Sequence, residues 1–73
     1  MNESQQTKIK KSFGTRVRAI RNSAAISQEA LALKCGLDRT YIGGVERGER
    51  NISLVNMHKM AKALEVSLRE FFE

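Results

Sequence analysis

The chain has 73 residues, with 13 Lys and Arg against 8 Asp and Glu, a formal net charge of +5 and an isoelectric point near 9.9. This length suits one domain with a small core, and a single cysteine excludes an internal disulfide framework. No apolar run approaches the roughly 18 residues of a membrane span, so we expect a soluble, cytoplasmic protein whose charge favours a polyanionic partner.

A polar segment opens the chain over residues 1–11, and it ends in three lysines, Lys8, Lys10 and Lys11. Chain ends of this composition are commonly frayed, and a basic arm that touches phosphate is the alternative. The folded domain is expected to occupy residues 12–73.

The first helix of this domain is expected near residues 12–22. Phe13, Val17 and Ile20 recur at the spacing of one helix face, and Ile9 extends the same stripe towards the N-terminus. Proline is absent and residues of high helix propensity dominate, so the whole domain is predicted to be all-α.

Four later helix starts share one sequence pattern. An apolar residue is followed by a capping Ser or Asp, and a second apolar residue stands four positions after the cap, where it can pack on the first. The pattern occurs as Ile26-Ser27…Leu31, Leu37-Asp38…Ile42, Ile52-Ser53…Met57 and Val66-Ser67…Phe71. It predicts helices near residues 27–35, 38–47, 53–64 and 67–72, the last with a capping box from Ser67 and Glu70.

The apolar faces of these helices predict a single core. Its expected members are Phe13, Val17, Ile20, Leu31, Ala32, Cys35, Leu37, Ile42, Val45, Ile52, Met57, Met60, Ala61, Leu64, Val66 and Phe71. Cys35 is most simply a small buried hydrophobe, and His58 is an isolated surface histidine. The sequence contains no nucleophile–base pair, carboxylate dyad, metal-ligand spacing or phosphate-binding glycine loop, so we expect no enzyme, metal, cofactor or small-molecule ligand.

Residues 27–48 form the centre of the chain. Gly36 ends the first of two short helices, because glycine readily takes the left-handed conformation of a helix end. Asp38 opens the second helix, and Gly48 closes it. Two helices joined by a tight turn with glycine are typical of a helix-turn-helix, whose second helix is suited to a DNA major groove.

This segment resembles the Cro/C1-type helix-turn-helix family, which has the lambda-repressor-like fold. The matching pieces are Ser27-Gln28, Leu31-Ala32, Gly36-Leu37-Asp38, Ile42, Glu46-Arg47-Gly48, Asn51-Ile52-Ser53, Ala61-Lys62-Ala63-Leu64 and Phe71. Residues 37–48 look most like the small controller proteins of restriction–modification systems. The resemblance implies a five-helix, sequence-specific regulator of transcription that acts as a homodimer on palindromic double-stranded DNA. The alternative is a module of the same fold that sequesters a protein partner, as an antitoxin or anti-repressor.

The exposed side of the second motif helix is expected to read base edges. Arg39 can bond two acceptors of a guanine, and Thr40 offers a methyl group and a hydroxyl. Gly43 and Gly44 are unusual here, since each glycine inside a helix costs about 1 kcal/mol against alanine. Either a neighbouring element packs closely on them, or their bare backbone lets the helix sit deep in the groove.

Contacts to the DNA backbone are expected around this helix. Gln28 begins the first motif helix, where N–H groups favour an anion, and the resemblance assigns it a phosphate contact. Tyr41 can donate to a phosphate or pack on a sugar. The other expected backbone contacts are Arg47, Arg50, Asn51 and Ser53, of which Asn51 and Ser53 also suit a turn and a helix cap.

Glu46 follows a residue of the predicted core, and a buried lone carboxylate would be costly. It therefore needs a cationic partner. The resemblance implies a structural ion pair with Arg21.

Three apolar residues near the end of the chain are not needed by the core: Val55, Leu68 and Phe72. Exposed together on a monomer, they would form an apolar patch of the kind that marks an interface, so we expect them in a two-fold dimer contact. The alternative is that Leu68 and Phe72 merely cover the edge of the core.

Overall fold

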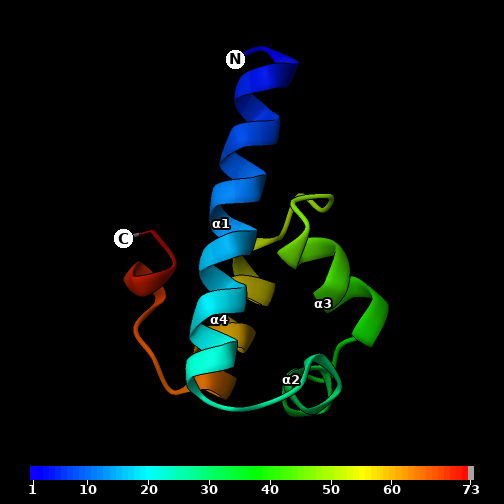
Figure 1. The fold of residues 1–73 in the computed structure, drawn as a ribbon, viewed down its shortest axis with the longest axis vertical. Helices are drawn as coiled ribbons and strands as arrows, with labels where there is room; N and C mark the ends of the chain where they lie inside the picture. The colour runs from blue at the N-terminus through cyan, green and yellow to red at the C-terminus, as the bar shows by residue number, and fades with distance from the viewer. Residues whose placement is uncertain (73) are drawn as a thin grey trace.

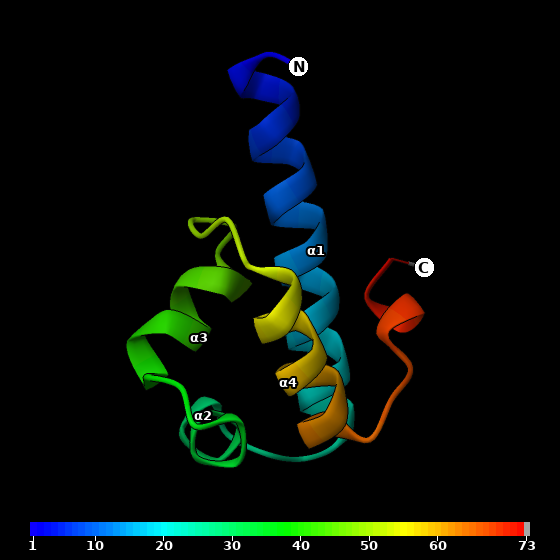
Figure 2. The same ribbon diagram turned by 180° about the vertical axis from the view of Figure 1, so that it is seen from behind.

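The computed structural model describes residues 1–72, so the last residue of the predicted domain lies outside the described range. The described residues form four α-helices, α1 (Glu3–Ser23), α2 (Gln28–Cys35), α3 (Arg39–Glu46) and α4 (Leu54–Leu64), and the 3-10 helix η1 (Leu68–Phe72). They include no strand, and the predicted all-α fold is confirmed. α3 and η1 lie on opposite sides of the pair formed by α1 and α4 (Figures 1 and 2).

α1 begins much earlier than the predicted position near residue 12. Asn2 caps it, since the Asn2 side chain accepts from the Gln5 N–H at 2.8 Å and the Gln5 side chain accepts from the Asn2 N–H at 2.9 Å. This reciprocal cap was not recognised in the sequence, and it lets the helix continue through the lysine-rich segment. The expected polar tail is therefore helical from Glu3 onwards, and it projects beyond the rest of the molecule (Figure 1).

The other predicted helix starts lie within one residue of those observed. The Ser27 and Ser53 side chains accept from N–H groups three residues later, at 3.0 and 3.1 Å. Asp38 occupies the same backbone position before α3, but its side chain makes no capping bond, so that part of the prediction is wrong. Asp38 is exposed to solvent.

The final element, predicted as a helix over 67–72, is the 3-10 helix η1. Only half of the predicted capping box forms, with the Ser67 N–H donating to the Glu70 carboxylate at 3.3 Å. The element is attached to α1 instead, because Arg16 Nε donates to the Glu70 backbone carbonyl at 2.6 Å. Phe71 also packs edge-on against Phe13, with ring centroids 5.3 Å apart.

The core was predicted correctly. Every expected member is either buried in one cluster or half-buried against it, and the most fully buried large side chains are Phe71, Leu31, Ile42, Met60, Val17 and Val45. This cluster joins all five elements. None of the helices in the described range is long and apolar enough to cross a membrane.

One close contact between α1 and α3 positions the motif, and the sequence analysis did not identify it. Gly14 lies against the C-terminal end of α3, where a Cβ on this residue would stand 2.7 Å from the Glu46 carbonyl oxygen and even nearer to that of Val45. Only glycine allows the two backbones to approach so closely. The crossing therefore sets where α3 sits relative to the longest helix.

Candidate nucleic-acid interface

α2 and α3 form the helix-turn-helix that the sequence predicted. Gly36 ends α2 with φ at 70°, and the Leu37 N–H donates to the Ala32 carbonyl at 3.0 Å. This left-handed end turns the chain sharply, as glycine allows at low cost. α3 then starts at Arg39 and buries Ile42 and Val45 completely or nearly so.

A buried ion pair fixes the C-terminal end of α3. Arg21 Nε donates to Glu46 Oε2 at 2.6 Å, and Arg21 Nη2 donates to Glu46 Oε1 at 3.0 Å. The two side chains are only 11% and 2% exposed. The hydrogen bonds with Glu46 raise the pKa of Arg21 above its usual value, against the opposing effect of burial. The pair joins α1 to α3.

Gln28 belongs to the same network. Its Nε2 donates to Glu46 Oε1 at 3.0 Å, so the side chain expected at a phosphate is bonded to α3 in the free protein. One amide hydrogen remains for another acceptor. The Arg21 Nη1 atom donates to the Ile26 carbonyl at 2.9 Å, which ties the loop before α2 to the same cluster.

The N-terminal turn of α3 is open to solvent. Arg39 and Thr40 are both exposed, as the predicted reading positions require. Arg39 Nε lies 3.8 Å from a Glu29 carboxylate oxygen, and the side chains are 62% and 75% exposed. Such a long, solvated pair holds Arg39 weakly.

Side chains of nearby arginines cover Gly43 and Gly44. A Cβ on Gly43 would stand 3.0 Å from Arg47 Nη1, and a Cβ on Gly44 would stand 3.0 Å from Arg50 Cγ. The next atom to a Cβ on Gly43 would be Gln28 Oε1 at the start of α2, at 3.6 Å, and no backbone atom of another helix is among the nearest atoms to either glycine. Both glycines are buried by flexible cations, which must move before a base can touch either one.

The loop after α3 contains a second Arg–Glu pair. Arg47 Nε donates to Glu49 Oε2 at 3.0 Å, and Arg47 Nη2 donates to Glu49 Oε1 at 3.1 Å. Both side chains are more than half exposed. The bonds with Arg47 lower the pKa of Glu49 below its usual value, and the same bonds raise the pKa of Arg47.

Tyr41 connects α3 to α4. Its hydroxyl accepts from Asn56 Nδ2 at 3.1 Å, and the Arg50 guanidinium lies 5.4 Å from its ring centroid, in range for a cation–π contact. Asn51 is exposed in the adjoining loop, and Ser53 acts as the cap of α4. The structure thus places the Arg50 side chain beside both Tyr41 and Gly44 of α3.

The sequence analysis missed three residues that shape or position this site. Glu49 stands between two arginines, and that alternation of charge was the available signal. Gly14 is an isolated glycine inside a helical stripe, a known sign of close packing. Asn56 had no signal, because only the tertiary structure places it beside Tyr41.

The apolar residues expected in a dimer contact differ in exposure. Val55 is 63% exposed and Phe72 65% exposed, whereas Leu68 is half-buried and packs on the core. Phe72 also leans on Phe13, with centroids 5.5 Å apart. Leu54, which was not predicted, is as exposed as its neighbour Val55, and both line an apolar hollow on α4.

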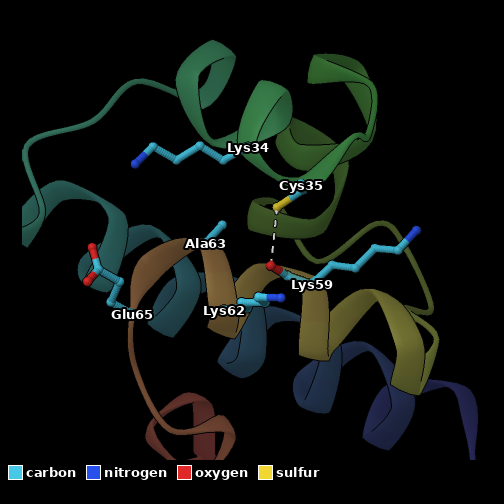
Figure 3. Close-up of a pocket in the computed structure, with 6 residues that line it drawn as sticks. All are labelled: Lys34, Cys35, Lys59, Lys62, Ala63 and Glu65. Atoms are coloured by element: carbon cyan, nitrogen blue, oxygen red, sulfur yellow. Dashed lines mark hydrogen bonds between the residues drawn. The ribbon is translucent and has the colours of Figure 1, made fainter.

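A hollow of about 480 Å³ between α2 and α4 does not form a ligand site. Cys35 lies there and its Sγ donates to the Lys59 carbonyl at 3.7 Å, while burial raises the pKa of the thiol. The Lys34 and Lys59 side chains point in opposite directions, so they do not converge on an anion (Figure 3). Within residues 1–72, no group of His, Cys, Asp or Glu side chains could hold a metal ion.

Known proteins resemble this chain over most of its length. The sequence model of the helix-turn-helix family matches residues 17–71. The control protein C.BamHI of Bacillus amyloliquefaciens is 50% identical over 62 residues, which cover 84% of this chain and 76% of that protein.

Two solved structures share the fold. The restriction–modification controller protein C.AhdI from Aeromonas hydrophila has a TM-score of 0.84 and 55% identity, over 85% of this chain and 94% of that chain. The controller protein C.Esp1396I, solved as a tetramer in complex with its natural 35 base-pair operator, has a TM-score of 0.78 and 40% identity. That match covers 85% of this chain and 82% of that one.

Proposed function

Because this chain belongs to the helix-turn-helix family, we propose that it is a sequence-specific DNA-binding regulator of transcription and the controller of a restriction–modification system. Its site of action is the cytoplasm, where a bacterial operator lies. The level of identity to control proteins, over most of their length, supports the finer part of this proposal.

The observation that carries the proposal is the layout of α3. One side of the helix is buried in the core, while Arg39 and Thr40 face solvent at its N-terminal turn and two more arginines gather at its C-terminal end. An exposed helix with cations at both ends fits a major groove, where side chains read base edges between two phosphate backbones.

In this proposal Arg39 and Thr40 contact bases. Gly43 and Gly44 meet the groove once the arginine side chains above them have swung towards the DNA. The contacts to the DNA backbone are made by Gln28, Tyr41, Arg47, Arg50, Asn51 and Ser53. Phosphate contacts of this kind set the register of the protein without reading sequence.

The regulator acts as a homodimer, since one reading helix spans too few base pairs for selective binding. A two-fold dimer presents two reading helices to half-sites about 34–36 Å apart. We place the dimer contact on Val55 and Phe72, with Leu68 at its edge, because the first two are large apolar side chains left exposed on the monomer.

Selection of bound sites from random duplex DNA tests this function. A palindromic consensus should emerge, and Arg39→Ala should cost about 1–3 kcal/mol on it while relaxing the preference at one guanine per half-site. Arg50→Ala should weaken operator and random DNA alike and lower the salt slope by about one. Equal losses on all sequences for Arg39→Ala would remove Arg39 from the reading positions, and failure to select any consensus would refute the function.

Sedimentation of two charge variants tests the dimer contact. Val55→Glu would bring like charges together across the two-fold axis, so this variant should be monomeric, with native helix content by circular dichroism. Leu33→Glu is the control, because Leu33 is also an exposed apolar residue but lies on α2, outside the proposed contact, so this variant should stay dimeric. A Val55→Glu protein that stays dimeric would place the interface elsewhere.

A further inference from the structure

Glu49 is an anion built into the middle of the cationic surface. It lies between Arg47 and Arg50 in the loop after α3, and both of its carboxylate oxygens accept from Arg47. Among the residues predicted to contact DNA, Arg47 is the only one within residues 1–72 whose guanidinium is bonded at two atoms to an exposed carboxylate. Glu49 therefore occupies the Arg47 guanidinium, which the proposed function assigns to a DNA phosphate.

The backbone around Glu49 is held firmly. The Glu49 N–H donates to the Gly44 carbonyl at 2.8 Å, and the Gly48 N–H donates to the Val45 carbonyl at 3.0 Å. Gly48 has φ at 77° and sits so close to α1 that a Cβ would stand 2.7 Å from Lys11 Cα. The backbone of Gly48 and Glu49 is thus fixed against α3 and α1, which keeps the Glu49 side chain within reach of Arg47.

The geometry of the pair copies the contact that a phosphate would make. Arg47 offers the Nε and Nη2 edge of its fork, which is the edge that takes two oxygens of a carboxylate or a phosphate. Both side chains are more than half exposed, so water competes for the pair and an incoming phosphate can replace the carboxylate at low cost.

We propose that Glu49 is an internal competitor for DNA phosphate, which occupies Arg47 in the free protein and so limits the affinity of the regulator for DNA. To bind a phosphate, Arg47 must first release Glu49. The free energy of the Arg47–Glu49 pair is therefore subtracted from that of the phosphate contact on any sequence. This inference rests on the proposed function, since it assumes that this surface meets DNA.

The test compares Glu49→Gln with the parent protein on a fluorescent duplex of random sequence, with salt varied between about 50 and 200 mM. Affinity should rise by up to about fivefold at 0.1 M salt, since an exposed ion pair is worth at most about 1 kcal/mol. The salt slope should steepen by up to about 0.9, the dependence of one phosphate contact, because salt screens the pair that opposes binding in the parent. Glu65→Gln is the matched control. It makes the same change of charge at the far end of α4, and it should leave both quantities unchanged.

A second comparison, made in an Arg47→Gln protein, separates competition for Arg47 from direct repulsion of phosphate by Glu49. In an Arg47→Gln protein, Glu49→Gln should have little further effect on affinity, because no guanidinium is left to release. A full rise in that background would mean that the carboxylate repels phosphates directly, and it would overturn the proposal, as would an unchanged affinity of Glu49→Gln itself. These measurements use random DNA, so their outcome is independent of whether a palindromic operator is found.

Discussion

Two Arg–Glu pairs lie at the C-terminal end of α3. They consist of the same residue types but differ in burial. Arg21 and Glu46 are 11% and 2% exposed and share their carboxylate with Gln28. Arg47 and Glu49 are 59% and 58% exposed, and their carboxylate faces solvent. Glu46 and Arg47 are consecutive in the chain, so one step around the helix separates a structural pair from an exchangeable one.

The comparison shows that burial decides what an ion pair does. A charge taken out of water must keep its partner, since an uncompensated buried charge is strongly unfavourable. A charge left in water can lose its partner with little change in the stability of the fold. The buried pair is therefore suited to holding α3 in place, and the exposed pair is suited to exchanging its partner for DNA.

The largest effect is expected from breaking the buried pair. Arg21→Met should leave Glu46 buried without its cation and lower the free energy of unfolding by about 3–5 kcal/mol. That is a large share of the about 4–11 kcal/mol expected for a domain of this size. Urea denaturation followed by circular dichroism measures it.

The companion variant replaces both partners. Arg21→Met combined with Glu46→Met should recover most of the lost stability, because two apolar side chains of similar size need no charge compensation. If the double variant is as unstable as the single one, the loss comes from packing or from the Gln28 contact, and the ionic interpretation fails.

A smaller loss of stability is expected from a substitution at Gly14, the other contact that holds α3 to α1. Gly14→Ala places a Cβ against the carbonyls of Val45 and Glu46, and backbone atoms cannot turn aside as side chains do. Overpacking of this kind costs about 1–3 kcal/mol. The melting temperature should fall accordingly, while Ser12→Ala, at an exposed position of the same helix, should not lower it.

Gly43→Ala should instead raise the stability of the protein. The nearest atom to its Cβ belongs to the tip of Arg47, and only a flexible guanidinium has to give way. The substitution should stabilise the protein by up to about 1 kcal/mol through helix propensity. A destabilised variant would show that the exposed pair is held more rigidly than its exposure indicates.

The smallest effect on stability is expected from Glu49→Gln. Because the pKa of Glu49 is lowered in the folded protein, its contribution is present above the unfolded pKa and is lost as the pH falls through the folded pKa. The pair is solvated, so the melting temperature at neutral pH should match that of the parent. A clear drop on substitution would mark this pair as structural too.

The helix boundaries could be read from the sequence because their causes are local. A capping Ser before α2 and α4 and a glycine after α2 act within a few residues of themselves. The start of α1 was predicted too late, although Asn2 and Gln5 are just as local, because a polar chain end is commonly frayed and was expected to be so here. Asp38 shows the limit of such signals, since it holds the cap position without making the bond.

Only part of the candidate site could be predicted from the sequence. Arg39 and Thr40 were placed on the exposed side of α3 from the spacing of its apolar residues, and the structure leaves both in solvent. Arg47 stands four residues after Gly43, so its cover of that glycine is a local helical contact. The cover of Gly44 by Arg50 could not be foreseen, because it depends on how the following loop folds back along the helix.

The sequence by itself determined the family, the helical content, the core and the charge of the reading surface, because apolar periodicity, caps and a glycine turn are written in neighbouring residues. The tertiary structure decided which polar side chains of this surface are already bonded in the free protein. Gln28 is bonded to Glu46, Arg47 to Glu49, and Arg50 lies over Tyr41. These partners depend on where the turns at Gly36 and Gly48 and the crossing at Gly14 carry each side chain, and burial then fixes which of the contacts can exchange.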